Sequence, residues 1–210
     1  FNNSKNLGEI TIPSTVRIID AYAFQNCTSL KEVNIGDEVT DIRNNAFDSC
    51  VSLTRIDIPK SVKSIGSFCF NKCTNLETVS LQEGIEQLGE NSFYGCTSLK
   101  NLNIPGSLKW VRTKWYLRST VLEKVTLGKG ITEIEPNGFY LCKNLKTISF
   151  PRSLTTIGES AFAGCGCLEK IILPNDVKTI GESAFLDCNR ITSIKLPNCY
   201  CEIGKDAFIA

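Results

Sequence analysis

The stretch LEKIILPNDVKTIGESAFLDCNR, residues 168–190, decides the fold, because the chain repeats it from end to end. Copies of this 23-residue unit begin at Leu7, Leu30, Leu53, Leu76, Leu99, Leu122, Leu145, Leu168 and Ile191, without an insertion or a deletion. A strict period of this length is typical of a solenoid, in which each unit packs only on its neighbours. The sequence therefore predicts one solenoid domain over residues 1–210.

The period also predicts what the two ends of the chain are. Residues 1–6 fall on the last positions of a preceding repeat, and Ala210 lies three residues short of completing the last one. Neither end carries a polar capping segment, and the terminal repeats of solenoids need such caps. We therefore expect the chain to be a fragment of a longer protein.

Each repeat is predicted to contain two short extended segments. Positions four and six, such as Ile171 and Leu173, are apolar in nearly every unit, which is the spacing of one face of a strand. Proline follows at position seven in six units and ends the strand, because it cannot donate to a ladder. Positions ten and thirteen, such as Val177 and Ile180, predict a second extended segment on another side of the coil.

The second half of the repeat predicts a bend and an aromatic column. Glycine follows the second segment in five units, where we expect a sharp bend with positive φ (Gly66, Gly89, Gly158, Gly181 and Gly204). Position eighteen is an aromatic residue in every unit (Phe24, Phe47, Phe70, Phe93, Tyr116, Phe139, Phe162, Phe185 and Phe208). The spacing of Ala, Phe and Cys at positions 17, 18 and 21 predicts one helical turn that places the ring and the thiol in the core.

Seven of the 11 cysteines occupy position twenty-one (Cys27, Cys50, Cys73, Cys96, Cys142, Cys165 and Cys188). Parallel side chains on neighbouring strands lie ~4.8 Å apart, whereas a disulfide needs Cβ atoms ~3.8 Å apart, so we predict a column of free core thiols. Cys167, Cys199 and Cys201 lie off this column and are candidates for exposed, reactive thiols. No metal site is expected, because the chain has no histidine and no CxxC pair.

Repeat five departs most from the pattern and is the first candidate binding site. Its second half contains both tryptophans of the chain and several cations: Trp110, Arg112, Lys114, Trp115, Tyr116 and Arg118. Trp110 takes position twelve, which is mostly polar in other repeats, so we expect its side chain to point outward. Tryptophan and arginine are enriched in binding hot spots, which favours a contact patch for a protein, a glycan or an anionic ligand. The other interpretation is a drifted repeat whose large side chains fill its own irregular core.

The outward positions of the predicted sheet, three and five, are the second candidate surface. They include Arg55, Asp57, Asn101, Asn103, Lys124, Thr126, Lys170 and Lys195. Solenoids use such extended faces for binding, but small polar side chains are equally expected of a face that only meets solvent.

Several functions are disfavoured by composition. The net charge of +1 provides no field for nucleic acid or an anionic membrane, and no apolar run approaches the ~18 residues of a membrane span. The absence of histidine excludes imidazole-based triads and Cys-His dyads, and no nucleotide-binding glycine motif is present, so no enzyme activity and no cofactor are expected.

The consensus LxxIxIPxxVxxIGxxAFxxCxx resembles the BspA-like leucine-rich repeat over nearly the whole chain. The resemblance implies a curved solenoid with a parallel β-sheet lining one face. Together with the segments read from the repeat positions, it predicts a right-handed leucine-rich-repeat coil with short strands and single helical turns on the other sides. It also implies an extracellular or cell-surface location and a role in adhesion to host proteins or to other cells. We therefore expect a non-enzymatic binding module whose ligand is a protein or a glycan. A structural spacer that projects another domain is the alternative function.

Overall fold

The computed structural model describes residues 1–112 and 121–209. The chain forms two compact units, the first ending at Leu102 and the second beginning at Asn103. In each unit the repeats stack as turns of a parallel β-solenoid, with strands paired at a constant offset of 23 residues, as in Ile10↔Val33 and Val125↔Ile148. The predicted solenoid is confirmed, together with its parallel sheet and its second set of strands.

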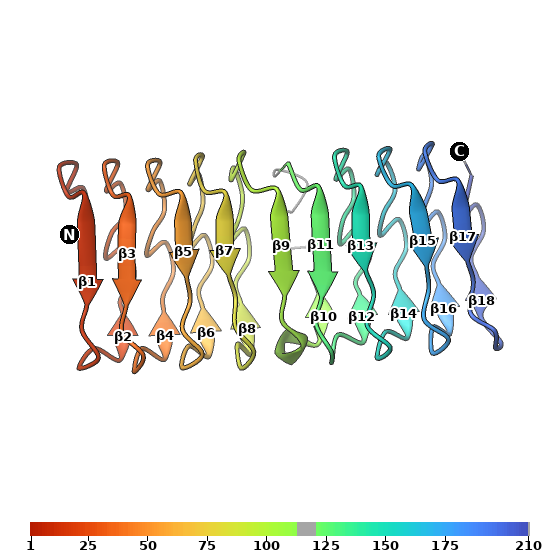
Figure 1. Ribbon diagram of the computed structural model, residues 1–210, viewed down its shortest axis with the longest axis horizontal. Coiled ribbons are helices and arrows are strands. Elements are labelled where there is room, and N and C mark those ends of the chain that lie inside the picture. The colour runs from red at the N-terminus through yellow and green to blue at the C-terminus, as the bar shows by residue number, and fades with distance from the viewer. Residues whose placement is uncertain (113–120, 210) are drawn as a thin grey trace. The chain divides into compact units, whose positions relative to one another are not determined.

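In the first unit, positions three to six form parallel strands that lie side by side (Figure 1). They are β1 (Glu9–Ile12), β3 (Glu32–Ile35), β5 (Arg55–Asp57), β7 (Thr78–Ser80) and the start of β9 (Asn101–Ile104). The second extended segments form another parallel sheet from β2 (Ile18–Ile19), β4 (Asp41–Ile42), β6 (Ser64–Ile65) and β8 (Gln87–Leu88).

The second unit repeats this arrangement. Its first set of strands is β11 (Lys124–Leu127), β13 (Thr147–Ser149), β15 (Lys170–Ile172) and β17 (Ser193–Lys195). Its second set is β10 (Trp110–Val111), β12 (Glu133–Ile134), β14 (Thr156–Ile157), β16 (Thr179–Ile180) and β18 (Glu202–Ile203). A short 3-10 helix, η1 (Gly106–Leu108), precedes β10. Within residues 1–112 and 121–209, no helix is long and apolar enough to cross a membrane.

The core of each unit contains the predicted aromatic column. The rings of Phe162 and Phe185 are 5.0 Å apart between centroids and 6° from parallel, and those of Phe47 and Phe70 are 5.8 Å apart. These spacings and the nearly parallel planes fall within the range of favourable aromatic stacking, which has centroids ~4.5–7 Å apart. Six of these rings are no more than 1% exposed (Phe47, Phe70, Phe93, Phe139, Phe162 and Phe185). Burial of the rings couples each repeat to the next.

The segment around each ring is a run of tight turns, so the predicted single helical turn is wrong. The N–H of Cys27 donates to the carbonyl of Phe24 in the same repeat, whereas the N–H of Phe24 donates to the carbonyl of Ala46 in the next repeat. Positions sixteen and twenty have positive φ in every described repeat, for example 57° at Asn45 and 61° at Ser49. A helical turn would direct these N–H groups into its own repeat, whereas the tight turns add a third set of hydrogen bonds between repeats.

The glycine that recurs at position fourteen in five repeats has a different role from the one predicted. None of the five glycines at this position has a φ in the left-handed range. Instead, a Cβ atom built on Gly89 would lie 2.2 Å from the backbone nitrogen of Ser67, and one on Gly181 would lie 2.4 Å from that of Glu159. In these five repeats the glycine allows the backbones of successive repeats to touch at this corner, whereas the other four repeats hold Asp20, Arg43, Arg112 and Glu135 at the same position.

Candidate interaction surfaces

Trp110 and Arg112 form an exposed pair at strand β10 in the second unit. The Trp110 side chain is 39% exposed, in agreement with its predicted outward direction. The Cζ atom of Arg112 lies 5.1 Å from the Trp110 ring centroid, which is the geometry of a cation–π contact. Arg112 Nη1 also donates to Oε1 of Glu135 at 3.2 Å, on the neighbouring repeat. The guanidinium is therefore held over the indole from two sides, and both groups remain accessible.

The surroundings of this pair explain why it stands out. Trp110 pairs in register with Glu133, and the next strands carry Thr156 and Thr179 at the same position. An indole at this position exposes apolar surface to water, whereas the hydroxyl or carboxylate groups of the neighbouring strands do not. The other residues predicted for the patch, Lys114, Trp115, Tyr116 and Arg118, lie outside the described residues.

The sheet face of the first unit is polar, and an ion pair within one strand neutralises part of its charge. Arg55 and Asp57 are exposed on one strand and form an ion pair, with Nε 2.9 Å from Oδ2. Glu9 and Glu32 lie opposite each other in register on β1 and β3. Among the other predicted residues, Asn101 is exposed at the start of β9, and Asn103, which is also exposed on β9, belongs to the second unit.

The sheet face of the second unit contains the remaining predicted residues. Lys124 is exposed and Thr126 is half-buried on β11, and Lys170 and Lys195 are exposed on β15 and β17. These side chains share one face because positions three and five both point away from the core. The predicted sheet-face residues are therefore divided between the two units.

The cysteine column consists of buried free thiols that make a repeated hydrogen bond. The thiol of Cys50 donates to the carbonyl of Phe24, and that of Cys165 donates to the carbonyl of Phe139, at 3.1 and 3.2 Å. Burial raises the pKa of Cys50 and of Cys142 to about 12, so these thiols stay protonated near neutral pH. The column is therefore poorly suited to nucleophilic or metal chemistry, which requires the thiolate.

The remaining thiols differ in exposure. Cys199 is exposed, whereas Cys167 and Cys201 are partly exposed. Cys69 was missed by the column pattern, because it replaces the small residue before Phe70; it is fully buried, and burial raises its pKa strongly. No group of three or more potential ligands for a metal ion occurs within the part of the chain that the structure describes.

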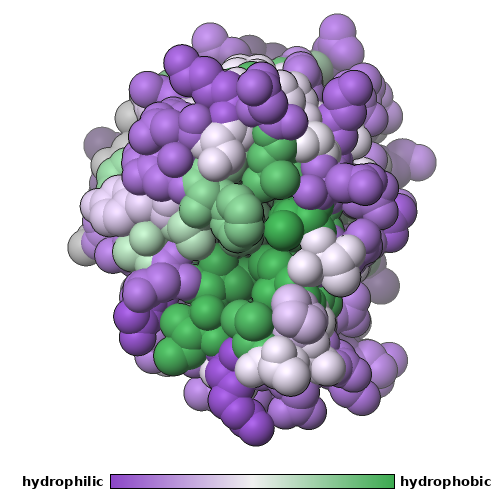
Figure 2. All heavy atoms as spheres, turned by 90° about the vertical axis from the view of Figure 1, so that its left-hand side faces the viewer, coloured by the Kyte–Doolittle hydropathy of each residue, from purple (hydrophilic) through white to green (hydrophobic). Residues whose placement is uncertain are grey.

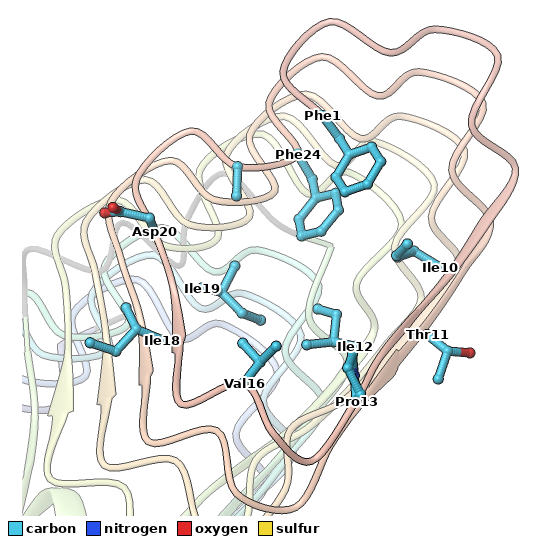
Figure 3. Close-up of a pocket in the computed structure, with 11 residues that line it drawn as sticks. Phe1, Ile10, Thr11, Ile12, Pro13, Val16, Ile18, Ile19, Asp20 and Phe24 are labelled. Atoms are coloured by element: carbon cyan, nitrogen blue, oxygen red, sulfur yellow. The ribbon is translucent and has the colours of Figure 1, made fainter.

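A cavity of about 380 Å³ opens at the face of the first unit that bears β1 and β2, where apolar residues gather (Figures 2 and 3). Val16, Ile19 and Phe24 point into it, whereas Thr11 points away. At the same positions of the next repeat, Val39 and Ile42 are buried in the core. The cavity thus has the composition of the repeat core, and it lacks the converging polar groups of a ligand site.

Comparison with known proteins identifies the type of repeat. A family model described as BspA type leucine-rich repeat region matches residues 1–123 and 114–210. The chain is similar to the crystal structure of a T. pallidum leucine-rich repeat protein, with 28% identity and a TM-score of 0.59 over 80% of this chain and 68% of that one. A leucine-rich repeat protein from Eubacterium ventriosum is 30% identical, with a TM-score of 0.61 over 94% of this chain and 46% of that one. No curated protein shows significant sequence similarity.

Proposed function

Because the chain belongs to the BspA-type leucine-rich repeat family, we propose that this protein-interaction module is a non-enzymatic adhesion module that acts outside the cell or at its surface. Its solenoid presents exposed side chains to a protein or to another cell, and the stacked core holds them in place. No step of this function needs a cofactor, and the buried, protonated thiols suit a structural role.

The observation that carries the proposal is the Trp110–Arg112 pair. Folding of the repeat does not require an indole at this position, because Glu133 and Thr156 serve in the same register. The exposed ring and the guanidinium over it form the combination that contributes most to protein interfaces. The ion pair with Glu135 favours this orientation of Arg112 in the free chain, which reduces the side-chain entropy lost on binding.

A spacer that projects another domain is the competing function. It is supported by the regularity of the hydrogen bonds between repeats, which gives each unit the same connection at every turn. A spacer would gain nothing from the solvent-exposed Trp110, and for that reason we favour adhesion.

The test is retention of chain-coated fluorescent beads on epithelial cell layers under flow. Beads coated with the chain should be retained well above beads coated with serum albumin at equal density. Retention at the albumin level would contradict the adhesion proposal and favour the spacer.

A further inference from the structure

The sheet face of the second unit differs in charge from that of the first. Its outward residues on β11, β13, β15 and β17 are Lys124, Thr126, Thr147, Ser149, Lys170, Ile172, Ser193 and Lys195, which include three cations and no carboxylate. We define this set as the basic face. On the first unit, the corresponding positions hold Glu9 opposite Glu32, and Arg55 is neutralised by Asp57.

The lysines of the basic face are available to a partner. Within the described residues, Lys124, Lys170 and Lys195 take part in no ion pair. The nearest carboxylates in sequence are Glu123 and Glu169, each one residue before a lysine, and Glu123 Oε2 already lies 2.6 Å from Lys146 Nζ. The basic face therefore keeps a net positive charge.

Ile172 is the second unusual feature of this face. It is 66% exposed, although its position holds Thr126, Ser149 and Lys195 in the other strands. Strand propensity alone does not explain an exposed isoleucine, because threonine, as at Thr126, is also β-branched and carries a polar group. Ile172 pairs in register with Lys195, and Lys170 lies two residues before it on β15. An exposed apolar side chain is thus flanked by two unpaired cations.

We propose that the basic face binds an acidic segment of a partner protein, whose carboxylates contact the lysines while one apolar side chain covers Ile172. With strands ~4.8 Å apart and alternate residues ~6.6 Å apart, the three lysines fit within the length of about five extended residues. A sulfated glycan would satisfy the lysines but would leave Ile172 exposed, which is why we favour a protein. The inference rests on the proposed role as a binding module, but not on the Trp110–Arg112 pair.

The test is binding of a fluorescent peptide of glutamates around one leucine, followed by anisotropy at low and at physiological salt. The chain should bind this peptide, and binding should weaken with salt because the contacts are solvent-exposed. Lys170→Gln and Lys195→Gln should each weaken binding about two- to fivefold. Ile172→Thr keeps the β-branch and should weaken binding about threefold or more. The matched control Arg55→Gln removes one cation from the face of the first unit and should leave binding unchanged.

Three results would overturn the proposal. The first is no detectable binding of the peptide, or equal binding by the double variant Lys170→Gln, Lys195→Gln. The second is tighter binding of a heparin oligosaccharide that is unaffected by Ile172→Thr, which would assign the face to a glycan. The third is salt-sensitive self-association lost in the double variant, which would assign the face to a second copy of the chain. Loss of peptide binding with bead retention intact would reject only this inference, whereas the reverse result would reject only the adhesion proposal.

Discussion

The thiol of Cys73 donates a hydrogen bond of 3.1 Å to the carbonyl oxygen of Phe47, one repeat earlier. The same carbonyl also accepts the N–H of Cys50, so that one oxygen joins two repeats. The bond recurs with the same sequence offset at Cys96 and Cys188. The thiols of the cysteine column therefore form hydrogen bonds between repeats and do more than fill space in the core.

This arrangement predicts that the cysteines of the buried column react far more slowly with a thiol reagent than the exposed Cys199. At pH 8, iodoacetamide should modify Cys199 in the native chain and leave Cys50, Cys73 and Cys96 unmodified, because the latter are buried and their pKa values are raised by burial. All 11 cysteines should react in denaturant. Peptide mass spectrometry after a short exposure measures this, and modification of Cys73 as fast as Cys199 would contradict it.

Stability should fall at alkaline pH. Burial raises the pKa of Cys50, Cys96 and Cys142 to about 12 in the folded chain, above the ordinary value of 9.0. Their contribution to stability is complete below pH 9 and is lost as the pH rises toward 12, because only the unfolded thiols ionise in that range. Each thiol should lower the unfolding free energy by ~1.4 kcal/mol per pH unit there. Urea unfolding between pH 9 and 11 should show a shallower slope for Cys50→Ala than for the wild type.

The aromatic column should dominate the stability of each unit. Phe162 is fully buried between the stacked rings of Phe139 and Phe185, so Phe162→Ala should cost about 3–5 kcal/mol in unfolding free energy. Phe208 is only partly buried and stacks on one ring, so Phe208→Ala should cost clearly less. Equal losses in urea unfolding would mean that stacking on both sides does not matter.

Gly181 should tolerate a side chain poorly, although other repeats hold larger residues such as Arg43 and Glu135 at its position. Gly181→Ala would place a Cβ atom 2.4 Å from the backbone nitrogen of Glu159 and should destabilise the chain by ~1–3 kcal/mol or more. Gly8→Ala is the matched control, because nothing lies within 4 Å of its Cβ position, and it should be neutral or slightly stabilising. Thermal unfolding of the two variants provides the comparison, and similar melting temperatures would refute the close approach of the backbones.

Much of the fold is predictable because an uninterrupted period determines register. The offset that aligns Ile56 with Val79 follows directly from the 23-residue spacing, and so does the stacking of the phenylalanines. The tight turns were not predicted, because the spacing of Ala, Phe and Cys also fits a helical turn. A partial signal is the presence of Asn45, Asn91 and Gly95 at positions sixteen and twenty, because asparagine and glycine favour positive φ. Other repeats hold Phe68 and Leu141 at these positions, so composition alone does not identify the turns.

The sequence did not reveal the close backbone contact at the corner glycine or the significance of Ile172 on the basic face. In both cases the residue type is compatible with more than one role. Glycine serves both positive φ and close backbone contact, and only coordinates distinguish the two at Gly89. The exposure of Ile172 follows from its outward position, but isoleucine is so common in strands that it gave no signal. Trp110 was easier to recognise, because an indole replaces polar residues at its position.

We infer that the chain contacts its partner at Trp110, where the sequence departs from its own repeat. The most direct test compares bead retention on epithelial cell layers for Trp110→Ala and for Thr156→Ala, which lies in the same column two strands away. Trp110→Ala should lower retention severalfold, while its urea unfolding and the retention of Thr156→Ala should stay at the wild-type level. Wild-type retention by Trp110→Ala would contradict the claim.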